Sequence, residues 1–363
     1  MKKQATLSRR TLLKGLGLGA VSSGLGMSLP SISRAAMQST LLGRATGVPM
    51  RRKTPGLLWT PLTETSNVAL VKGNDRREIT LAALKKIEDE ILAGLQGKKR
   101  VLIKPNFVTT NRPLCATHVD AIRAILDVIT PHFKGEILIG ESTASRAGTF
   151  DGYKNYGYLS LEKEYGIKLI DLNKQTYHRS YVFGKGNHPL GLRLIDTFFD
   201  PDLYIISAAK LKTHDRVVTT LSLKNVLLAA PLNDYKKNDK GITHTQNNFQ
   251  KETVLHYNLF HLAQQIWPDL SVIDGFEGME GEGPVGGDPY DSRITVASTD
   301  PLAADKVATK VMGFDPDQIM YLQTMTQAGM GQGDLDKITI LGNSLAECQC
   351  KFRISKKLVE AYG

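Results

Sequence analysis

The sequence has few cysteines and lacks several common catalytic motifs. Three cysteines among 363 residues are too few for a disulfide scaffold. The patterns G-x-x-x-x-G-K-[ST], H-E-x-x-H and C-x-x-C are absent, which excludes a P-loop, a zincin helix and a thioredoxin-type dithiol. The apolar content of 41% and the charged content of 23% are ordinary globular values, which excludes a disordered or collagen-like chain.

Acidic residues are missing from the N-terminal segment, where the excess positive charge lies. The chain has 46 Lys and Arg against 36 Asp and Glu, and ten of the basic residues precede residue 63, where no acid occurs. The other 36 basic residues balance the 36 acids, so the body has no net charge. A neutral body offers no electrostatic surface for a polyanion, and we expect no nucleic-acid partner.

Residues 1–36 have the order of an export signal. Residues 8–14 read SRRTLLK, which matches the twin-arginine (Tat) consensus, and a glycine-rich apolar run and a small-residue exit follow. The run is short for a membrane span, although an uncleaved signal would act as an anchor. We predict a Tat signal peptide, the Tat translocon as partner during export, a periplasmic or otherwise exported protein, and no stable membrane span after cleavage.

The body predicts an α/β fold. Strand-like apolar runs alternate with helix-like stretches from residue 66 onward, which is typical of mostly parallel sheets flanked by helices. We expect two lobes around a polar crevice with a boundary near 190, a linker or strap at 37–65, a main domain at 66–342 and a tail at 343–363. The expected strands are 67–72, 100–104, 136–140, 168–172, 203–208, 270–274, 293–298 and 337–341, with β-rich stretches at 178–183 and 192–195. The expected helices are 78–95, 117–132, 253–267 and 301–312, with a glycine-rich loop at 275–291.

Polar clusters follow several of these strands. Ligands of parallel sheets bind beyond the carboxyl ends of the strands, so clusters at four such ends predict a site for an anionic ligand or a metal. Each cluster also has a structural explanation, such as a solvated strand end or a helix-capping acid. The candidate ligand-binding residues are Lys104, Asn106, Glu141, Ser142, Lys210, Lys212, Asn225, Asp274, Gly283 and Gly286.

His214 and Lys224 are the candidate catalytic residues. His214 follows two lysines and precedes an aspartate, which does not suit a dry core. Lys224 lies in an apolar stretch, where its amine either reaches the surface or projects into the site. His214 and His244 are candidate metal ligands, although His244 lies in a polar stretch and is equally well explained as a surface histidine.

The glycine-rich loop and the cysteines are weaker signals. Gly281, Gly283 and Gly286 match G-x-G-x-x-G, but Pro284 interrupts the match and no helix follows directly. The three nearby glutamates either bind a hard cation or face solvent. Cys348-Gln349-Cys350 places two thiols on one face of an expected strand; with Cys115 they are too few for an iron–sulfur cluster, and none is expected.

Taken in order, the clusters resemble the motifs of the family called domain of unknown function 362, over about residues 66–342. The motifs are Lys104-Pro105-Asn106, Gly140-Glu141-Ser142, Lys210-Leu211-Lys212-Thr213-His214, Ser222-Leu223-Lys224-Asn225, Asp274-Gly275 with the 281–287 loop, and Asp300-Pro301 through Pro316. Some relatives carry ferredoxin-type cysteine runs, which this chain lacks. Residues 205–224 are also distantly similar to the nickel-pincer lactate racemase family, in which histidines and a lysine hold a nucleotide-derived metal cofactor. That similarity implies such roles for His214 and Lys224, but Ser222 and Leu223 replace the glycine pair before that family's lysine.

Two functions fit these observations. The first is an exported enzyme that binds a metal or organic cofactor and acts on a small anionic molecule by redox or proton-transfer chemistry. The second is a periplasmic ligand- or cofactor-binding accessory protein without turnover. Substrate turnover, as opposed to stoichiometric binding alone, separates them.

Overall fold

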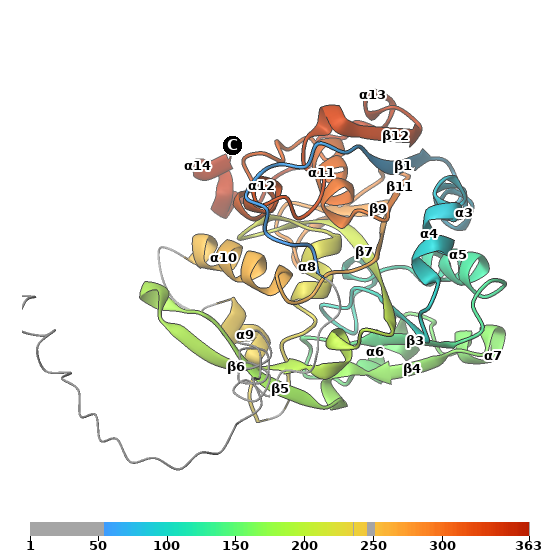
Figure 1. Ribbon diagram of the computed structural model, residues 1–363, viewed down its shortest axis with the longest axis horizontal. Helices are drawn as coiled ribbons and strands as arrows, with labels where there is room; N and C mark the ends of the chain where they lie inside the picture. The colour runs from blue at the N-terminus through green and yellow to red at the C-terminus, as the bar shows by residue number, and fades with distance from the viewer. Residues whose placement is uncertain (1–53, 235, 245–250, 363) are drawn as a thin grey trace, which may run out of the picture. The chain divides into compact units, whose positions relative to one another are not determined.

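The computed structural model describes residues 54–362 except 235 and 245–250 (Figure 1). The predicted signal peptide therefore lies outside the described residues. Within the described part of the chain, no helix has the length and apolar character needed to cross a membrane.

A single large sheet organises these residues. Its main path follows the order β12-β1-β11-β9-β7-β2-β3-β4. These strands are β1 (Ser66–Lys72), β2 (Arg100–Lys104), β3 (Glu136–Glu141), β4 (Lys168–Asp171), β7 (Leu203–His214), β9 (Leu270–Glu280), β11 (Ile294–Ser298) and β12 (Ile338–Gly342). β11 is antiparallel to both of its neighbours and every other adjacent pair on the path is parallel, so the carboxyl ends of the remaining strands meet at one edge.

Helices cover both faces of this sheet (Figure 1). Successive side chains of a strand point to opposite faces of the sheet, and both faces are apolar here. In β2, Val101 and Ile103 join one apolar core, while Leu102 joins the core on the other face. The first core includes α3 (Arg76–Lys86), α4 (Glu88–Leu95) and α5 (Val119–Ile129). The opposite face packs against α8 (Ser222–Leu227), α10 (Lys251–Ala263), α11 (Pro301–Val311) and α12 (Met320–Gln327).

Smaller elements complete the described fold. The strands β8 (Val218–Thr220) and β10 (Asp288–Tyr290) pair with β7 and β9, and β5 (Tyr177–Phe183) and β6 (Pro189–Ile195) form a separate antiparallel pair. The short helices are α6 (Thr149–Asn155), α7 (Leu161–Tyr165), α9 (Asp239–Thr243), α13 (Leu345–Cys348) and α14 (Val359–Tyr362).

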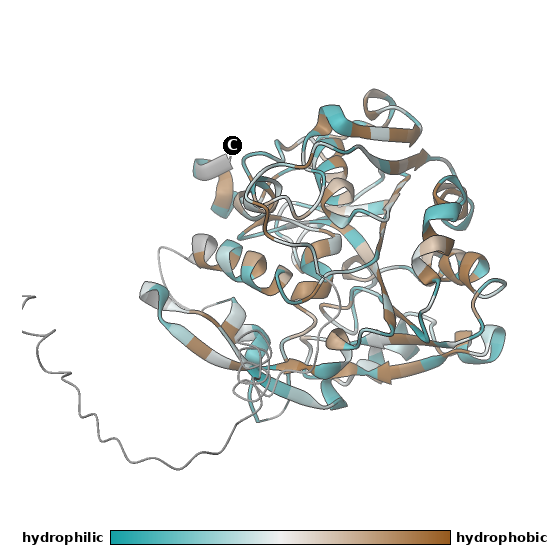
Figure 2. Cartoon of the chain, in the orientation of Figure 1, coloured by the Kyte–Doolittle hydropathy of each residue, from teal (hydrophilic) through white to brown (hydrophobic). Residues whose placement is uncertain are grey.

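α5 shows how the sequence determines a helix. Its apolar residues recur at helical spacing and are buried against the sheet, and Figure 2 shows this helix as mostly apolar. His118 is the N-cap, because its Nδ1 accepts a hydrogen bond from Asp120 N at 3.2 Å. Thr117, where this helix was expected to begin, accepts from Asn106 N at 3.0 Å and donates to Ala208 O. That threonine therefore ties the end of β2 to β7.

The predicted α/β class is confirmed, but a two-lobe division is not. β2 and β3 precede residue 190 and β7 follows it, yet β2 pairs directly with both in one sheet. Two strands are also longer than expected. β7 continues to His214, and β9 continues to Glu280, so the expected loop at 275–291 contains strand residues.

Two further expectations were wrong in detail. The helix expected over 78–95 is divided at Ile87 into α3 and α4. Cys348 and Cys350 do not lie on a strand: Cys348 ends α13, and Cys350 follows in an extended segment without strand pairing.

The described residues before β1 and after β12 both form hydrogen bonds with the rest of the fold. Thr54 Oγ1 donates to Gln264 O at 3.2 Å, and Leu58 N donates to Ala328 O at 2.9 Å. Near the C-terminus, Cys350 N donates to Val311 O at 2.8 Å.

Candidate functional site

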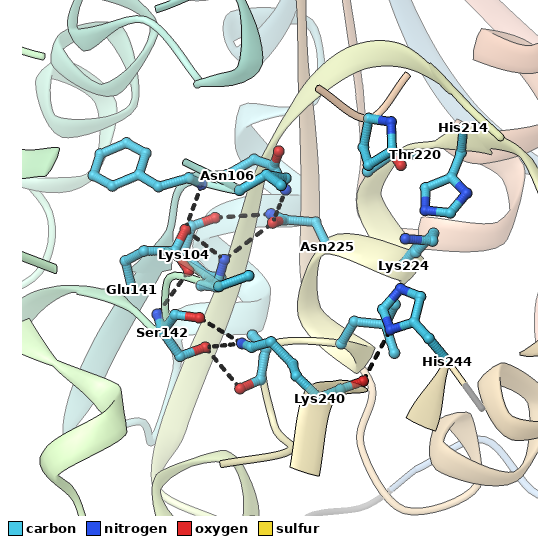
Figure 3. A pocket seen from close by; sticks show the side chains of 16 residues that line it. Lys104, Asn106, Glu141, Ser142, His214, Thr220, Lys224, Asn225, Lys240 and His244 are labelled. Carbon is cyan, nitrogen blue, oxygen red and sulfur yellow. Dashed lines mark hydrogen bonds and ion pairs between the residues drawn. The ribbon is translucent and has the colours of Figure 1, made fainter. Parts of the chain in front are cut away.

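A small cavity lies at the carboxyl ends of β2, β3 and β7 (Figure 3). Its volume is about 90 Å³, well below the roughly 300–1,000 Å³ of sites for drug-sized ligands. The residues that line it are Lys104, Asn106, Phe107, Val108, Glu141, Ser142, Ala144, His214, Thr220, Lys224, Asn225, Leu228, Ala229, Lys240, His244 and Pro284. The polar clusters that follow β2 and β3 thus meet His214 at the end of β7, Lys224 and Asn225 of α8, and His244.

Lys104 is the centre of a saturated hydrogen-bond network. Its Nζ donates to Glu141 Oε2 at 2.9 Å, to Asn225 Oδ1 at 3.1 Å and to the carbonyl of Pro105. An ammonium group has three donors, so none remains for a ligand. Burial lowers the pKa of Lys104, and the neighbouring Glu141 carboxylate opposes that effect.

Glu141 is held by backbone groups as well as by Lys104. Its two carboxylate oxygens accept from Phe107 N and Ser142 N, both at 2.6 Å. The carboxylate therefore joins the loop after β2 to the end of β3. Its role in this geometry is to fix the wall of the cavity.

A chain of amides extends the network behind the cavity. Asn106 Nδ2 donates to Asn225 Oδ1 at 2.8 Å, and Lys212 Nζ donates to Asn106 Oδ1 and to Cys115 O. Burial lowers the pKa of Lys212 to about 7. The predicted residue Lys212 thus supports Asn106 from behind and does not line the cavity.

α8 is held at its N-terminus by a buried carboxylate of α11. Asp305 accepts from Ser222 N at 2.8 Å and from Leu223 N at 3.0 Å. Ser207 of β7 also donates to Ser222 O at 2.8 Å. Burial raises the pKa of the Asp305 carboxyl to about 8, although both backbone donors favour its charged form. These contacts fix the position of Lys224 and Asn225, which follow directly in the same turn of α8.

Lys224 differs from the other lysines of the site. The residue is 5% exposed and lines the cavity, and its Nζ has no hydrogen-bond or ion-pair partner within the described residues. Burial, reinforced by the positive charge of Lys212, lowers the pKa of Lys224 to about 7. Figure 3 shows Lys224 between the rings of His214 and His244.

The two histidines are nearly parallel, with ring centroids 6.1 Å apart. His214 Nδ1 accepts from Arg216 N at 3.1 Å, so its neutral ring carries the proton on Nε2. His244 Nδ1 donates to Lys240 O at 2.9 Å, which leaves the lone pair on Nε2. Burial and the nearby lysines lower the pKa of His214 well below its usual range and that of His244 to about 3.

Lys240 is a lining residue that sequence reasoning missed. Its Nζ donates to Ser142 Oγ at 2.7 Å and to Ser142 O, which leaves one donor unassigned by these contacts. Burial lowers its pKa to about 7. Its position four residues before the candidate His244 could have identified it, because residues at this spacing share one face of a helix.

The charge of the lining favours an anion. Three lysines face one carboxylate, Glu141, which is already bound to Lys104. In the part of the chain that the structure describes, no group of three or more His, Cys, Asp or Glu residues could hold a metal ion. Lysines around His214 and His244 would also repel a cation, so these donors suit an anion better than a metal.

Some predicted residues lie outside the cavity. Lys210 and Asp274 pair with each other, with Nζ 3.6 Å from Oδ2, and Arg76 Nε donates to Asp274 at 3.1 Å. Gly283 packs against β7, where a Cβ would lie 2.0 Å from Thr213 O. Gly286 donates its N–H to Glu282 O within the same loop. The structure therefore does not bring these four predicted residues together with the rest.

The acids of the glycine-rich loop bind the C-terminal segment. Glu280 accepts from Arg353 Nε at 2.8 Å, and Glu282 accepts from Ser355 Oγ at 2.9 Å. These contacts explain both residues as structural. The three cysteines are free and buried.

Residues 101–310 match the family model described as Domain of unknown function (DUF362). The match covers more than half of the chain, so the chain belongs to this family. The chain is also similar to the thylakoid-associated protein sll1697 of Synechocystis sp., with 30% identity over 236 residues, which are 64% of this chain and 68% of that protein. The family description assigns no activity, so the chemistry of the cavity is argued from its own residues.

Proposed function

We propose that the cavity binds a small organic anion and that Lys224 transfers a proton to or from it. The observation that carries this proposal is the Lys224 amine, which lines the cavity and lacks a hydrogen-bond or ion-pair partner among the described residues. A lysine with a pKa of about 7 is divided between its acid and base forms at neutral pH, which suits proton transfer.

The surrounding residues supply complementary functions. The remaining donor of Lys240 and the Nε2–H of His214 are available to hold an anionic group, while Nε2 of His244 can accept a proton. Phe107 and Leu228 add an apolar part to the lining. These features favour a carboxylate with a short apolar chain as the ligand.

Solvent exchange tests this proposal directly. The full-length protein is incubated in deuterated buffer with lactate, alanine, pyruvate or malate, and loss of proton signals next to the carboxylate is followed by NMR. We expect exchange with at least one compound and its loss in Lys224→Met, whereas Lys168→Met, at an exposed salt bridge, behaves like wild type. Binding without exchange by any compound contradicts the proposed proton transfer and supports the accessory-protein function.

We also propose that the protein is exported and that the cavity can hold an anionic organic cofactor. The SRRTLLK motif supports export, and the thylakoid-associated relative is compatible with it. The distant similarity to the nickel-pincer family is compatible with a cofactor, since His214 and Lys224 both line the cavity. Native mass spectrometry and metal analysis of protein exported through its own signal test for such a group.

A further inference from the structure

We propose that Lys224 forms an imine with the carbonyl group of a small oxo acid bound in the cavity. This inference rests on the proposed anion site and assigns it a substrate class. Its basis is a difference between lysines at one cavity: the amines of Lys104 and Lys240 are hydrogen-bonded to protein groups, whereas that of Lys224 has no such partner in the described chain.

The Lys224 amine lies beside the space that the carbonyl group of a bound oxo acid would occupy. Lys224 projects between the rings of His214 and His244, within a cavity of about 90 Å³. A ligand confined to such a volume must lie close to that amine. If Lys240 and His214 hold the carboxylate through their remaining donors, the adjacent carbonyl carbon of an oxo acid lies within the same small space.

Imine formation is a condensation that releases water and needs no oxidant or reductant. The lone pair of the neutral Lys224 amine attacks the carbonyl carbon, a C–N bond forms, and the former carbonyl oxygen leaves as water with the two amine protons. A proton released from nitrogen can pass through His244 Nε2 to the departing oxygen, while His214 Nε2–H, on a neutral ring, stays hydrogen-bonded to the carboxylate. Each group therefore has one role in the dehydration, and no net proton is gained or lost.

The protonation state of the amine supports this assignment. Burial lowers the pKa of Lys224 to about 7, whereas an ordinary lysine has a pKa of about 10.4, so roughly a thousandfold more of the Lys224 amine is neutral at pH 7. Buried Lys306 is a useful contrast, because its Nζ pairs with Asp317. Burial alone therefore does not make an amine available.

Reductive trapping tests the imine. The full-length protein is incubated at neutral pH with pyruvate or glyoxylate and then with borohydride, and adducts are mapped by peptide mass spectrometry; lactate, which lacks the carbonyl, is the control ligand. We expect the adduct on Lys224 to exceed that on any other lysine by at least about tenfold, because its amine faces the cavity without a protein partner and a larger fraction of it is neutral than in an ordinary lysine. Equal labelling of many lysines, or no adduct on Lys224, would overturn the inference.

Two variants and a binding measurement distinguish imine formation by Lys224 from anion binding in the cavity. Lys224→Arg keeps a positive charge but has no amine that forms an imine under these conditions, so it should lose trapping. Lys240→Met should weaken binding of the oxo acid and so reduce trapping, while circular dichroism and thermal melting confirm that both variants fold. Acetate binding by wild type without trapping would reject the imine alone, whereas failure to bind acetate, lactate or pyruvate would reject the anion site as well.

Discussion

Lys224 is costly to bury as a cation, because its amine has no partner among the described residues and other cations lie nearby. Its pKa is lower in the folded protein, about 7, than in the unfolded chain, about 10.4. The unfolded chain therefore binds more protons between these values, and the contribution of Lys224 to stability rises with pH across that window.

Lys224→Met should remove this penalty. We expect the variant to be more stable than wild type at about pH 6 and the difference to shrink as the pH rises from about 7 to above about 10.4, where the wild-type amine becomes neutral in both the folded and the unfolded state. Urea unfolding at several pH values measures the difference. A difference that does not change with pH would show that Lys224 has an ordinary pKa.

Ligand affinity should depend on pH with the opposite sign. An anion binds best to protonated lysines, and Lys224 and Lys240 lose their protons as pH rises through about 7. The affinity of wild type for acetate should therefore fall between about pH 6 and about pH 9, with a tenfold loss for each proton taken up on binding per pH unit. Isothermal titration in buffers of different ionisation enthalpy checks the proton uptake; constant affinity would contradict the lysine assignment.

The sequence indicated which polar residues lie at strand ends. It did not indicate which of them form hydrogen bonds or ion pairs with one another. Lys104, Asn106 and Glu141 follow recognisable strands, so their convergence was predictable. The mutual pairing of Lys210 and Asp274 was not, because it depends on the register between β7 and β9.

Among the elements, α8 determines where Lys224 points. It has only six residues, all of them buried, so its position depends on tertiary contacts more than on intrinsic helix stability. Asp305 provides two of these contacts through the backbone of Ser222 and Leu223. Asp305 is therefore a positioning residue for the site.

Asp305→Ala should destabilise the protein by on the order of 2 to 4 kcal/mol, because two buried N–H groups lose their acceptor. Asp305→Asn keeps one carbonyl oxygen and should lose less. Chemical denaturation measures both, with the exposed Asp291→Ala as control, expected within about 0.5 kcal/mol of wild type. If Asp305→Ala matched that control, Asp305 would not hold α8.

The glycine-rich loop approaches β7 closely at Gly283. In Gly283→Ala the new Cβ would lie 2.0 Å from the backbone oxygen of Thr213, so the loop must move, at a cost of about 1–3 kcal/mol. Gly191→Ala is the matched control, because nothing lies within 4 Å of a Cβ at that position. Equal melting temperatures for the two variants would contradict this contact.

Strands were predictable where apolar runs end at polar or turn residues, as in β2 and β3. β7 was cut short because Lys210, Lys212 and His214 do not resemble a buried strand. The burial of Lys210 and Lys212 is possible because amide, carbonyl and carboxylate groups from other segments contact their amines. The site itself caused the error, since its polar residues replace the apolar pattern.

For the whole molecule, the expected class of fold followed from the alternation of strands and helices, but the division into lobes did not. The boundary expected near 190 falls in the separate β5–β6 pair, while the main sheet continues across it. Which strands become neighbours depends on contacts distant in sequence, such as β2 with β7, that local patterns do not encode.

Export is tested on the whole chain. Replacing Arg9 and Arg10 together by lysine should retain the protein in the cytoplasm, because the twin-arginine pair is the proposed recognition element. Fractionation in a Tat-competent bacterial host measures this, with Arg51→Lys and Arg52→Lys as a paired control outside the motif. Export of the Arg9/Arg10 variant at the wild-type level would contradict the predicted signal.

We propose that the lysine-lined cavity is an anion site centred on Lys224. The most direct measurement is isothermal titration of the full-length protein with acetate, lactate and pyruvate at about pH 6.5, for wild type, Lys224→Met and the surface control Lys168→Met. We expect wild type and the control to bind at least one of them, and Lys224→Met to bind it roughly 10- to 100-fold more weakly, the value of a hydrogen bond to a charged group. Equal affinity in all three proteins, or no binding to wild type, would contradict the claim.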